Sequence, residues 1–339
     1  MSASRPESPS LPAFRGESTR HQLARRLLSH PTIVLSGARL ARELGVSRST
    51  IWREIEALRR AGVRLKGEPA TGYRLEAAPD LLLPELVAPH LRGHWGRDIR
   101  HFFVLDSTQN AAVNAARAEA PEGAVFVAEE QTAGRGRREH QWSSPPGAGI
   151  YCSLVLRPQS PPGSLLSLTL ASGLALREAL REACGLEPEL RWPNDLLFAG
   201  RKLGGILLEM SAEATRIQYA VLGFGINAGP MDFPGELKDL ATSLAHHCAR
   251  VPARAVLLAA ALERLEARYR QCQSREGAAG IREEFEKTSP YARGLRVRVG
   301  EGHEVWTGVT QGLDEQGFLR VRRDDGREEI VYNGPVRPV

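Results

Sequence analysis

The chain has 339 residues, of which 42% are hydrophobic and 25% charged. This composition is typical of globular proteins and excludes collagen-like, coiled-coil and wholly disordered chains. At about 100–200 residues per domain, the length predicts two or three domains. The longest apolar run, residues 255–262, is far shorter than the roughly 20 residues that cross a bilayer, and nothing near the start resembles a signal peptide. We therefore expect a cytoplasmic protein without a membrane partner.

The distribution of charge and the number of cysteines limit the kinds of partner and of metal or disulfide site to be expected. Residues 1–78 hold 14 basic and 7 acidic side chains, whereas residues 79–339 hold 31 and 33, so attraction for a polyanion is expected at the N-terminal end. Only four of the 45 basic residues are lysines, which makes a lysine inside a motif informative. The four cysteines fit neither zinc-ligand spacing nor a dense disulfide framework, and we expect them to be reduced.

The first predicted domain covers residues 20–78 and follows a flexible tail, residues 1–19. Apolar spacing predicts helices over residues 20–29 and 36–44, and Gly45 and Ser47 suit the turn and the N-cap before a third helix. In that third helix, Ile51, Ile55 and Leu58 recur on a core-facing side. The outward residues of its N-terminal half are Arg48, Ser49, Thr50 and Arg53. This is a helix-turn-helix pattern, whose second helix enters the DNA major groove.

A hairpin is predicted directly after these helices. Residues 63–67 and 72–75 alternate with period two around a Glu-Pro-Ala-Thr loop, which puts Arg64, Lys66 and Arg74 on one polar face. The alternative is a small helical interaction domain whose arginines only contact solvent. The hairpin and the positive charge favour a winged helix-turn-helix that binds DNA.

From residue 100 onward, strands and helices alternate as in a layered fold of mixed α and β elements. Strands are expected at residues 101–105, 124–128, 150–156, 203–210 and 218–223, and helices at residues 109–119, 165–183 and 253–272. No P-loop motif is present, and the Gly-Arg stretch at residues 134–139 lacks the third glycine of a dinucleotide fingerprint.

Three clusters carry candidate chemistry. Asp106, Ser107 and Thr108 precede a predicted helix, and taken alone they are most simply explained as helix capping. Residues 129–138, followed by Trp142, form a loop rich in glycine and arginine. Its arginines offer bidentate donors for phosphate or carboxylate, and we expect it to be a lid ordered by an anion. The alternatives for this loop are a solvated basic segment and a second nucleic-acid contact.

The third cluster combines Arg191-Trp-Pro-Asn-Asp195 with Lys202-Leu-Gly-Gly-Ile-Leu207. A carboxylate, an amide, an amine and two adjacent glycines lie across one predicted hairpin, a set that suits an α-phosphate, a metal ion and a close backbone approach. Asn194 and Asp195 could otherwise form only the turn. The presence of Lys202 in an arginine-dominated chain argues against that simpler interpretation.

Taken in order, and with Gly223-Phe-Gly-Ile-Asn227, these motifs strongly resemble those of biotin–protein ligases. With the winged helix in front, the chain is similar to the bifunctional ligase/repressor form, and the resemblance covers residues 20–339. It implies an α+β multidomain protein with a class II aminoacyl-tRNA-synthetase-like mixed sheet and helices over residues 84–290. It also implies an SH3-like β-barrel over residues 291–339, where residues 295–299, 304–309 and 317–321 alternate like short strands.

The resemblance implies a two-step reaction: biotin and MgATP give biotinyl-5′-AMP, and a lysine of a biotin carboxyl carrier domain then takes the biotinyl group. It implies catalytic roles for Arg137, Lys202 and Asp195, with Asp195 orienting either Mg²⁺ or Lys202. The implied biotin-binding residues are Ser107, Thr108, Gln131, Gly134, Arg135, Gly205 and Lys202. The implied ATP and adenylate residues are Arg135, Arg137, Arg138, Trp142, Asn194 and Asn227.

The resemblance further implies a homodimer promoted by the adenylate, which binds operator DNA and represses the biotin operon. Three alternatives stay open: a ligase without repressor activity, a transcription factor that senses biotin without productive catalysis, and a lipoate ligase. The intact Arg137, Asp195 and Lys202 set disfavours the sensor, and the Gly-Arg and Trp-Pro-Asn-Asp motifs favour biotin over lipoate.

Overall fold

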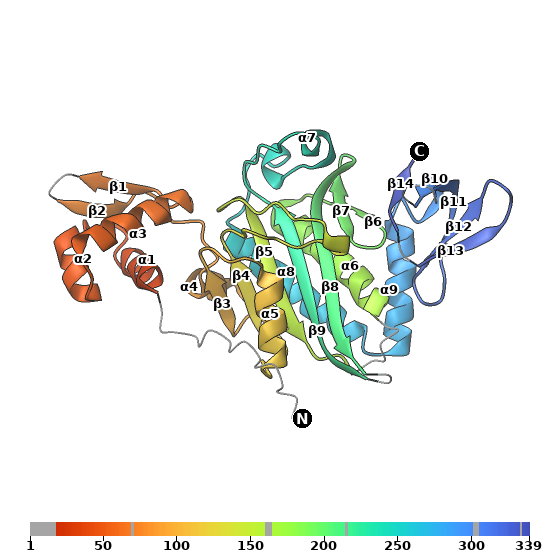
Figure 1. The fold of residues 1–339 in the computed structure, drawn as a ribbon, viewed down its shortest axis with the longest axis horizontal. Helices are drawn as coiled ribbons and strands as arrows, with labels where there is room; N and C mark the ends of the chain where they lie inside the picture. The colour runs from red at the N-terminus through yellow and green to blue at the C-terminus, as the bar shows by residue number, and fades with distance from the viewer. Residues whose placement is uncertain (1–17, 69–70, 160–164, 214–215, 301–304, 333) are drawn as a thin grey trace, which may run out of the picture. The chain divides into compact units, whose positions relative to one another are not determined.

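The computed structural model describes residues 18–68, 71–159, 165–213, 216–300, 305–332 and 334–339, and the chain divides after Asp80 into two compact units (Figure 1). Residues 1–17 of the predicted tail lie outside the described residues. Ser18 and Thr19 belong to the first helix rather than to the tail, because Ser18 is its N-cap and accepts a hydrogen bond from the His21 amide.

The first unit is a three-helix core followed by a hairpin. Its elements are α1 (Thr19–Ser29), α2 (Gly37–Leu44), α3 (Arg48–Arg60), β1 (Leu65–Glu68) and β2 (Gly72–Leu75). Ser36 and Ser47 cap α2 and α3 through their hydroxyls, and Gly45 ends α2 with φ +65°. The predicted helix-turn-helix is therefore confirmed, with α2 starting one residue later than expected because Ser36 is its cap.

The hairpin is joined to the helices through its second strand. Leu35 and Tyr73 exchange two backbone hydrogen bonds of 2.8 and 2.9 Å. Gly72 has φ +134°, and a Cβ there would lie 2.3 Å from the Leu35 oxygen, so only glycine fits this approach. Lys66 lies opposite Arg74 in the antiparallel register, which confirms that they share one face.

The second unit is built on a seven-stranded mixed sheet of order β3-β4-β5-β9-β8-β7-β6. Its strands are β3 (Ile99–Phe102), β4 (Val125–Ala128), β5 (Gly149–Leu156), β6 (Glu189–Arg191), β7 (Asp195–Phe198), β8 (Arg201–Ala212) and β9 (Ile217–Asn227). Within this sheet, β3 runs parallel to β4, and the other five pairs of neighbouring strands are antiparallel. The strand expected at residues 101–105 starts and ends earlier, because its pairing with β4 stops at Phe102.

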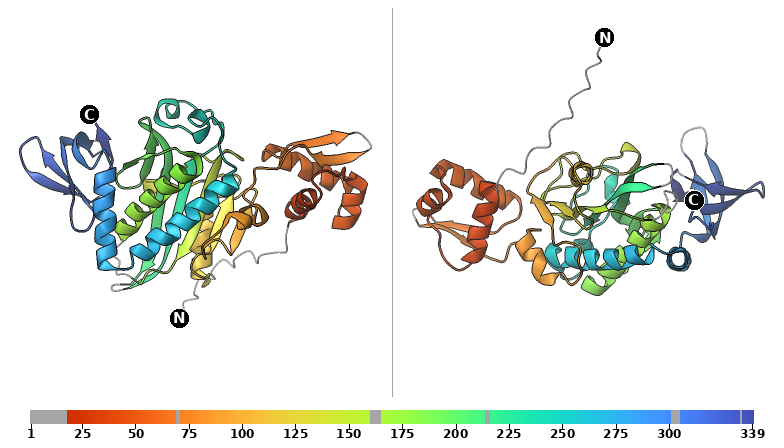
Figure 2. Two further views of the ribbon diagram at one scale, coloured as in Figure 1. Left: turned by 180° about the vertical axis from the view of Figure 1, so that it is seen from behind. Right: turned by 90° about the horizontal axis from the view of Figure 1, so that it is seen from below.

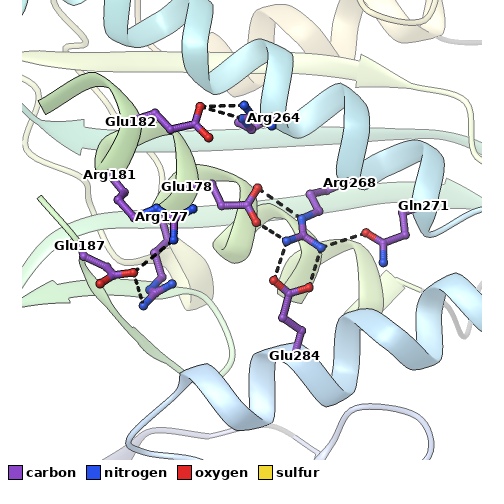
Figure 3. A network of polar contacts seen from close by, with 9 residues as sticks. All are labelled: Arg177, Glu178, Arg181, Glu182, Glu187, Arg264, Arg268, Gln271 and Glu284. Atoms are coloured by element: carbon purple, nitrogen blue, oxygen red, sulfur yellow. Dashed lines mark hydrogen bonds and ion pairs between the residues drawn. The ribbon is translucent and has the colours of Figure 1, made fainter. Parts of the chain in front are cut away.

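Helices cover both faces of this sheet. Helix α5 (Thr108–Arg117) packs on one face against Phe126, Val155 and Val221. Neighbouring residues of the same strands point to the other face, which is covered by α6 (Leu165–Cys184) and α8 (Arg254–Gln271), as Figure 2 shows from behind. Helix α9 (Arg275–Thr288) packs beside α6, and Arg268 of α8 links α6 to α9 (Figure 3).

A smaller antiparallel sheet of order β13-β12-β11-β10-β14 ends the second unit. Its strands are β10 (Arg293–Val299), β11 (Trp306–Leu313), β12 (Leu319–Arg323), β13 (Glu328–Val331) and β14 (Val336–Pro338). Residue 304, where a strand was expected to start, lies outside the described residues. The Trp192 Nε1 donates to the Gly317 oxygen at 3.0 Å, and this bond ties the small sheet to the large one.

The remaining short helices are α4 (Pro84–Val87), η1 (Ala88–His90), η2 (Arg137–Glu139), α7 (Leu237–Leu240) and η4 (Leu244–His246). Of the helices in the described ranges, none combines the length and apolarity needed to cross a membrane.

Candidate active site and DNA-binding surface

The three sequence clusters of the second unit meet around one cavity of about 280 Å³. It is lined by the start of α5, the Gly-Arg loop, the β7–β8 hairpin, the middle of β9 and residues 334–337. The predicted site residues in its lining are Ser107, Thr108, Gln131, Arg135, Arg137, Arg138, Trp142, Asn194, Asp195, Lys202 and Gly205. Gly134 and Asn227 are not part of the lining.

One group of lining residues carries hydroxyl and amide groups. Ser107 is the N-cap residue of α5 by backbone position, but its side chain makes no capping hydrogen bond. Its Oγ is buried and has no hydrogen-bond partner among the described residues. The Gln131 Oε1 accepts from the Thr108 amide at 2.9 Å and from the Thr108 hydroxyl at 3.1 Å. Capping therefore fails to explain Ser107, whose hydroxyl is left for a ligand.

Two residues that the sequence analysis did not select support this group. The Ser153 hydroxyl donates to the Gln109 Oε1 at 3.0 Å and lies 2.9 Å from the Thr108 hydroxyl. The Gln109 Nε2 in turn donates to the Val221 oxygen at 3.1 Å. A serine within the otherwise apolar strand β5 and a glutamine directly after Asp-Ser-Thr were the available signals.

A second group of lining residues is cationic. The Asp195 carboxylate binds the Lys202 Nζ at 2.6 Å through one oxygen and Arg191 at 2.6 Å through the other. Burial acts to raise the pKa of Asp195, but Lys202 and Arg191 outweigh it and hold that pKa below its ordinary value. Asp195 is therefore a fixed anion that orients Lys202. Arg191, quoted in the motif but not selected as a site residue, completes the arrangement.

The same contacts bear on the predicted magnesium role of Asp195. Both of its oxygens already bind cations, and the described residues contain no group of three His, Cys, Asp or Glu side chains arranged as metal ligands. This donor set does not fit a dedicated magnesium site.

The Gly-Arg loop folds back on itself beside these cations. The Trp142 amide donates to the Gly134 oxygen at 2.9 Å, and a Cβ on Gly134 would lie 2.4 Å from the Trp142 oxygen. Gly134 thus shapes the loop. Arg137 donates to the Asn194 Oδ1 at 3.2 Å. Burial lowers the pKa of the Arg137 guanidinium, and the neighbouring Arg138 lowers it further. Both effects oppose the positive charge, so an anion bound beside Arg137 would be favoured.

Trp142 lies within the cavity where two glycines make room for it. A Cβ on Gly225 would lie 2.5 Å from the indole, and one on Gly205 would lie 3.3 Å from it. The Lys202 Nζ is 5.5 Å from the indole centroid, and the indole nitrogen is buried without a partner in the described structure. Asn227, by contrast, is buried and donates to the Thr242 oxygen at 2.9 Å, so residues after β9 cover it.

The first unit presents the predicted DNA-binding residues on two elements. Arg48, Ser49 and Arg53 on α3 are exposed, and Thr50 is half-buried. The hairpin residues Arg64 and Lys66 are exposed and Arg74 is half-buried. The sequence analysis missed Trp52, whose side chain is 60% exposed on the same helix.

Three family models match the chain in succession. An HTH domain covers residues 19–74, the Biotin/lipoate A/B protein ligase family covers residues 102–227, and the Biotin protein ligase C terminal domain covers residues 294–334.

Similar proteins are found over most of the chain. The bifunctional ligase/repressor BirA of Bacillus subtilis is 36% identical over 301 residues, which are 87% of this chain and 91% of that protein. The Escherichia coli protein of the same name is 30% identical over 290 residues, 85% of this chain and 88% of its own length. Among solved structures, the biotin protein ligase from Aquifex aeolicus in complex with biotin and ATP has a TM-score of 0.62 and 28% identity, and the match covers 72% of this chain and 100% of that one.

Proposed function

The chain belongs to the biotin–protein ligase family in its ligase/repressor form, and from that premise we propose which of its residues carry each step. The protein is a ligase that forms biotinyl-5′-AMP from biotin and ATP and passes biotin to a lysine of a carrier domain. The observation that carries the proposal is one cavity whose lining combines an unpartnered Ser107 hydroxyl with the cations Lys202 and Arg137.

Ser107, Thr108 and Gln131 bind the ureido ring of biotin. A ureido group has one carbonyl acceptor and two N–H donors, and hydroxyl and amide groups can satisfy both kinds. The Ser107 hydroxyl is the free member of this set, while Ser153 and Gln109 hold Thr108 in position. Arg135 and the Gly205 backbone bind the acyl end.

In the first step a carboxylate oxygen of biotin attacks the α-phosphorus of ATP, and pyrophosphate leaves. Both reactants are anions, so their approach requires positive charge where the negative charge develops. Lys202, held by Asp195, and Arg137, held by Asn194, provide it, and Arg138 extends it toward the phosphates. Mg²⁺ enters with ATP and neutralises phosphate charge. Trp142 provides an aromatic face for adenine, and Asn194 flanks the adenylate. Asn227, which was expected to share this role, is buried against Thr242 outside the cavity lining and is assigned no ligand contact.

In the second step the carrier lysine attacks the acyl carbon and AMP leaves. Because the mixed anhydride hydrolyses readily, the Gly-Arg loop must exclude water until the carrier docks. Arg137 links this loop to the turn between β6 and β7 through Asn194, which gives the loop a closing contact.

The first unit makes the ligase a biotin-responsive repressor of the biotin operon. Ligand-promoted homodimerisation would present two α3 helices to a palindromic operator. We further propose the boundaries 18–78, 84–290 and 291–339 for the three domains, the first starting at the Ser18 cap of α1 and not at residue 20. We also propose a class II synthetase-like relationship for the central domain and an SH3-like barrel for the last. We also propose a cytoplasmic location, because ATP, the carboxylase carrier and operator DNA would all be met there.

The test combines the wild-type protein with biotin and MgATP, with and without an apo carrier domain, and measures pyrophosphate release and biotinylated carrier. We expect both products, and neither when lipoate replaces biotin. Pyrophosphate release without biotinylated carrier would mean that the protein forms the adenylate but does not transfer biotin. The absence of both products would favour a biotin sensor without catalysis.

Two variants distinguish the role of Lys202 from that of Arg137. Lys202→Ala should slow single-turnover adenylate formation by about 10²-fold or more, as expected when one charge-stabilising donor is lost. Arg137→Ala should still form adenylate but release it to solvent faster. Unchanged synthesis in Lys202→Ala, or equal retention of adenylate by Arg137→Ala and the wild type, would contradict these roles.

A further inference from the structure

Trp52 differs from every other apolar residue of the recognition helix. Ile51, Ile55 and Leu58 of α3 are at most 1% exposed and form the core of the first unit, whereas the Trp52 side chain is 60% exposed. An indole is a large apolar surface with one polar atom. Leaving it in water forgoes stabilisation that burial would give, so this exposed position needs a reason other than folding.

The neighbours of Trp52 on α3 define the kind of surface that it completes. Residues three and four apart lie side by side on a helix, so Trp52 lies next to Arg48 and Ser49, and Arg53 follows it. Arg48, Ser49 and Arg53 are all exposed. The acidic residue nearest to Arg53, Glu54, is 9% exposed and binds Arg20 at 2.8 Å and Arg53 at 3.4 Å. Glu56, one turn after Trp52, pairs with Arg59 at 2.6 Å. The exposed surface of the N-terminal half of α3 therefore carries two arginines around an apolar centre, and the carboxylates nearest to it are already paired with arginines.

This combination matches one feature of DNA. Phosphates flank the major groove on both sides, and the groove floor presents an apolar group only at the 5-methyl of thymine. Trp52 is the fifth residue of α3, within the N-terminal half of the helix that contacts base edges in helix-turn-helix proteins. Arginines on this helix can bind phosphates or read guanine, but neither contact recognises the methyl group of thymine, for which an apolar side chain is required.

We infer that Trp52 is a specificity-determining residue that contacts the 5-methyl group of a thymine in the major groove, between the contacts made by Arg48 and Arg53. The inference rests on the proposed operator binding. It names the base feature that the helix reads, and it predicts that thymine is required at one fixed position of each half-site.

The test begins with an operator selected by the full-length wild-type protein from a random DNA pool in the presence of biotin and MgATP. Each thymine is then replaced in turn by deoxyuridine, which removes only the methyl group, and affinity is measured by fluorescence anisotropy. At one position per half-site we expect wild-type binding to weaken about fourfold, which corresponds to about 0.8 kcal/mol for one apolar group. Trp52→Ala should bind the thymine operator more weakly and show no thymine–uracil difference there.

Arg53→Ala is the matched control, because it should weaken binding through lost charge and yet keep the fourfold thymine–uracil ratio. On a duplex of guanine and cytosine alone, the wild type and Trp52→Ala should bind equally. Circular dichroism verifies that the variant remains folded.

Several results would overturn the inference. If Trp52→Ala binds the operator as tightly as the wild type does, Trp52 makes no contact with the operator. If the wild type and Trp52→Ala show the same ratio of affinities for the thymine and the uracil operator, a residue other than Trp52 contacts the methyl group. Loss of the ligand-bound dimer by Trp52→Ala in sedimentation without DNA would assign Trp52 to a protein interface. If the wild type selects no operator, the proposed repressor function fails as well, which distinguishes that outcome from failure of Trp52 alone.

Discussion

The Ser107 hydroxyl is buried in the ligand-free protein without a hydrogen-bond partner among the described residues. A buried polar group in this state costs about 1–3 kcal/mol, so a ligand that accepts or donates there gains the bond without displacing one. Ser107→Ala should therefore leave the melting temperature of the free protein unchanged or slightly higher, while the Kd for biotin rises about fivefold to tenfold. Isothermal titration with biotin and a thermal melt measure the two effects.

Ser153→Ala is the comparison for Ser107, because the Ser153 hydroxyl is paired with both Thr108 and Gln109. Removing it leaves partners unsatisfied, and the variant should lose stability as well as affinity. A Ser107→Ala protein that melts lower than the wild type and binds biotin normally would show that Ser107 has a folding role instead.

Glu129 and Arg254 form a buried ion pair behind the cavity. Glu129 is 0% exposed and binds Arg254 at 2.7 Å, the His101 ring at 2.9 Å and the Leu82 amide at 2.7 Å. Arg254→Met would leave the carboxylate buried without its countercharge, at a cost of about 3–5 kcal/mol. Chemical denaturation at pH 7 measures this loss. The double variant with Glu129→Gln should recover part of it.

The same pair has a defined pH dependence. Burial acts to raise the pKa of Glu129, but Arg254, His101 and the Leu82 amide lower it to about 2, below its ordinary value of 4.5. Its stabilisation is thus complete above pH 4.5 and is lost as the pH falls toward 2. The stability deficit of Arg254→Met should consequently shrink below pH 4.5. A deficit that stays constant down to pH 3 would contradict the assignment to this carboxylate.

At the scale of elements, Arg268 of α8 connects three helices (Figure 3). It binds Glu178 of α6, Glu284 of α9 and Gln271 of its own helix. The Arg268 side chain is 15% exposed and Glu284 is 41% exposed. We therefore expect Arg268→Met to cost about 2 kcal/mol, less than the roughly 3–5 kcal/mol of a fully buried pair. Urea unfolding measures the change.

Arg264 is the matched control for this network, because it lies one turn earlier on α8 and pairs with Glu182 of α6 (Figure 3). Both side chains of that pair are about 40% exposed (37% and 43%), so Arg264→Met should cost at most about 1 kcal/mol. Equal losses in the two variants would mean that burial does not set the strength of these ion pairs.

How far the sequence predicts these elements depends on their length and burial. Long elements with a clear apolar period, such as α6 and α8, are predicted within one or two residues. Strand β6 is missed because its three residues carry too little alternation. The hairpin predicted across Asp195 and Lys202 is present as the antiparallel pair β7–β8. Helix α9 is missed because Ile281 and Phe285 are its only buried residues, which leaves most of its surface polar.

The sequence predicts the candidate site only in part. The resemblance to biotin–protein ligases implies that the Gly-Arg loop and Lys202 meet at one ligand, and both line the same cavity. The sequence does not predict that Asn227 is covered by residues after β9, or that Ser153 and Arg191 support the site. These relations depend on strand register, such as the pairing of Asp195 with Gly205, which no local pattern encodes.

At the scale of the whole molecule, the cavity and the recognition helix belong to different compact units. A ligand in the second unit can affect DNA binding only if the two events share a free energy of coupling, and the proposed ligand-promoted dimerisation would provide one. Operator affinity should then rise when biotin and MgATP are both present, and depend on the square of protein concentration below the dimer dissociation constant. Half-sites should be spaced by one DNA turn, about 34–36 Å, or a multiple of it.

The decisive measurement titrates the operator with protein plus biotin and MgATP and then adds apo carrier domain. Transfer of biotin to the carrier consumes the adenylate, so operator binding should fall in step with biotinylated carrier. A carrier whose acceptor lysine is changed to arginine cannot take biotin and should leave the complex intact, unless it competes for the dimer surface. Arg137→Ala, which loses adenylate to solvent, should need more biotin for the same occupancy. Operator binding that is insensitive to biotin, MgATP and carrier would separate the two activities and leave a ligase without a switch.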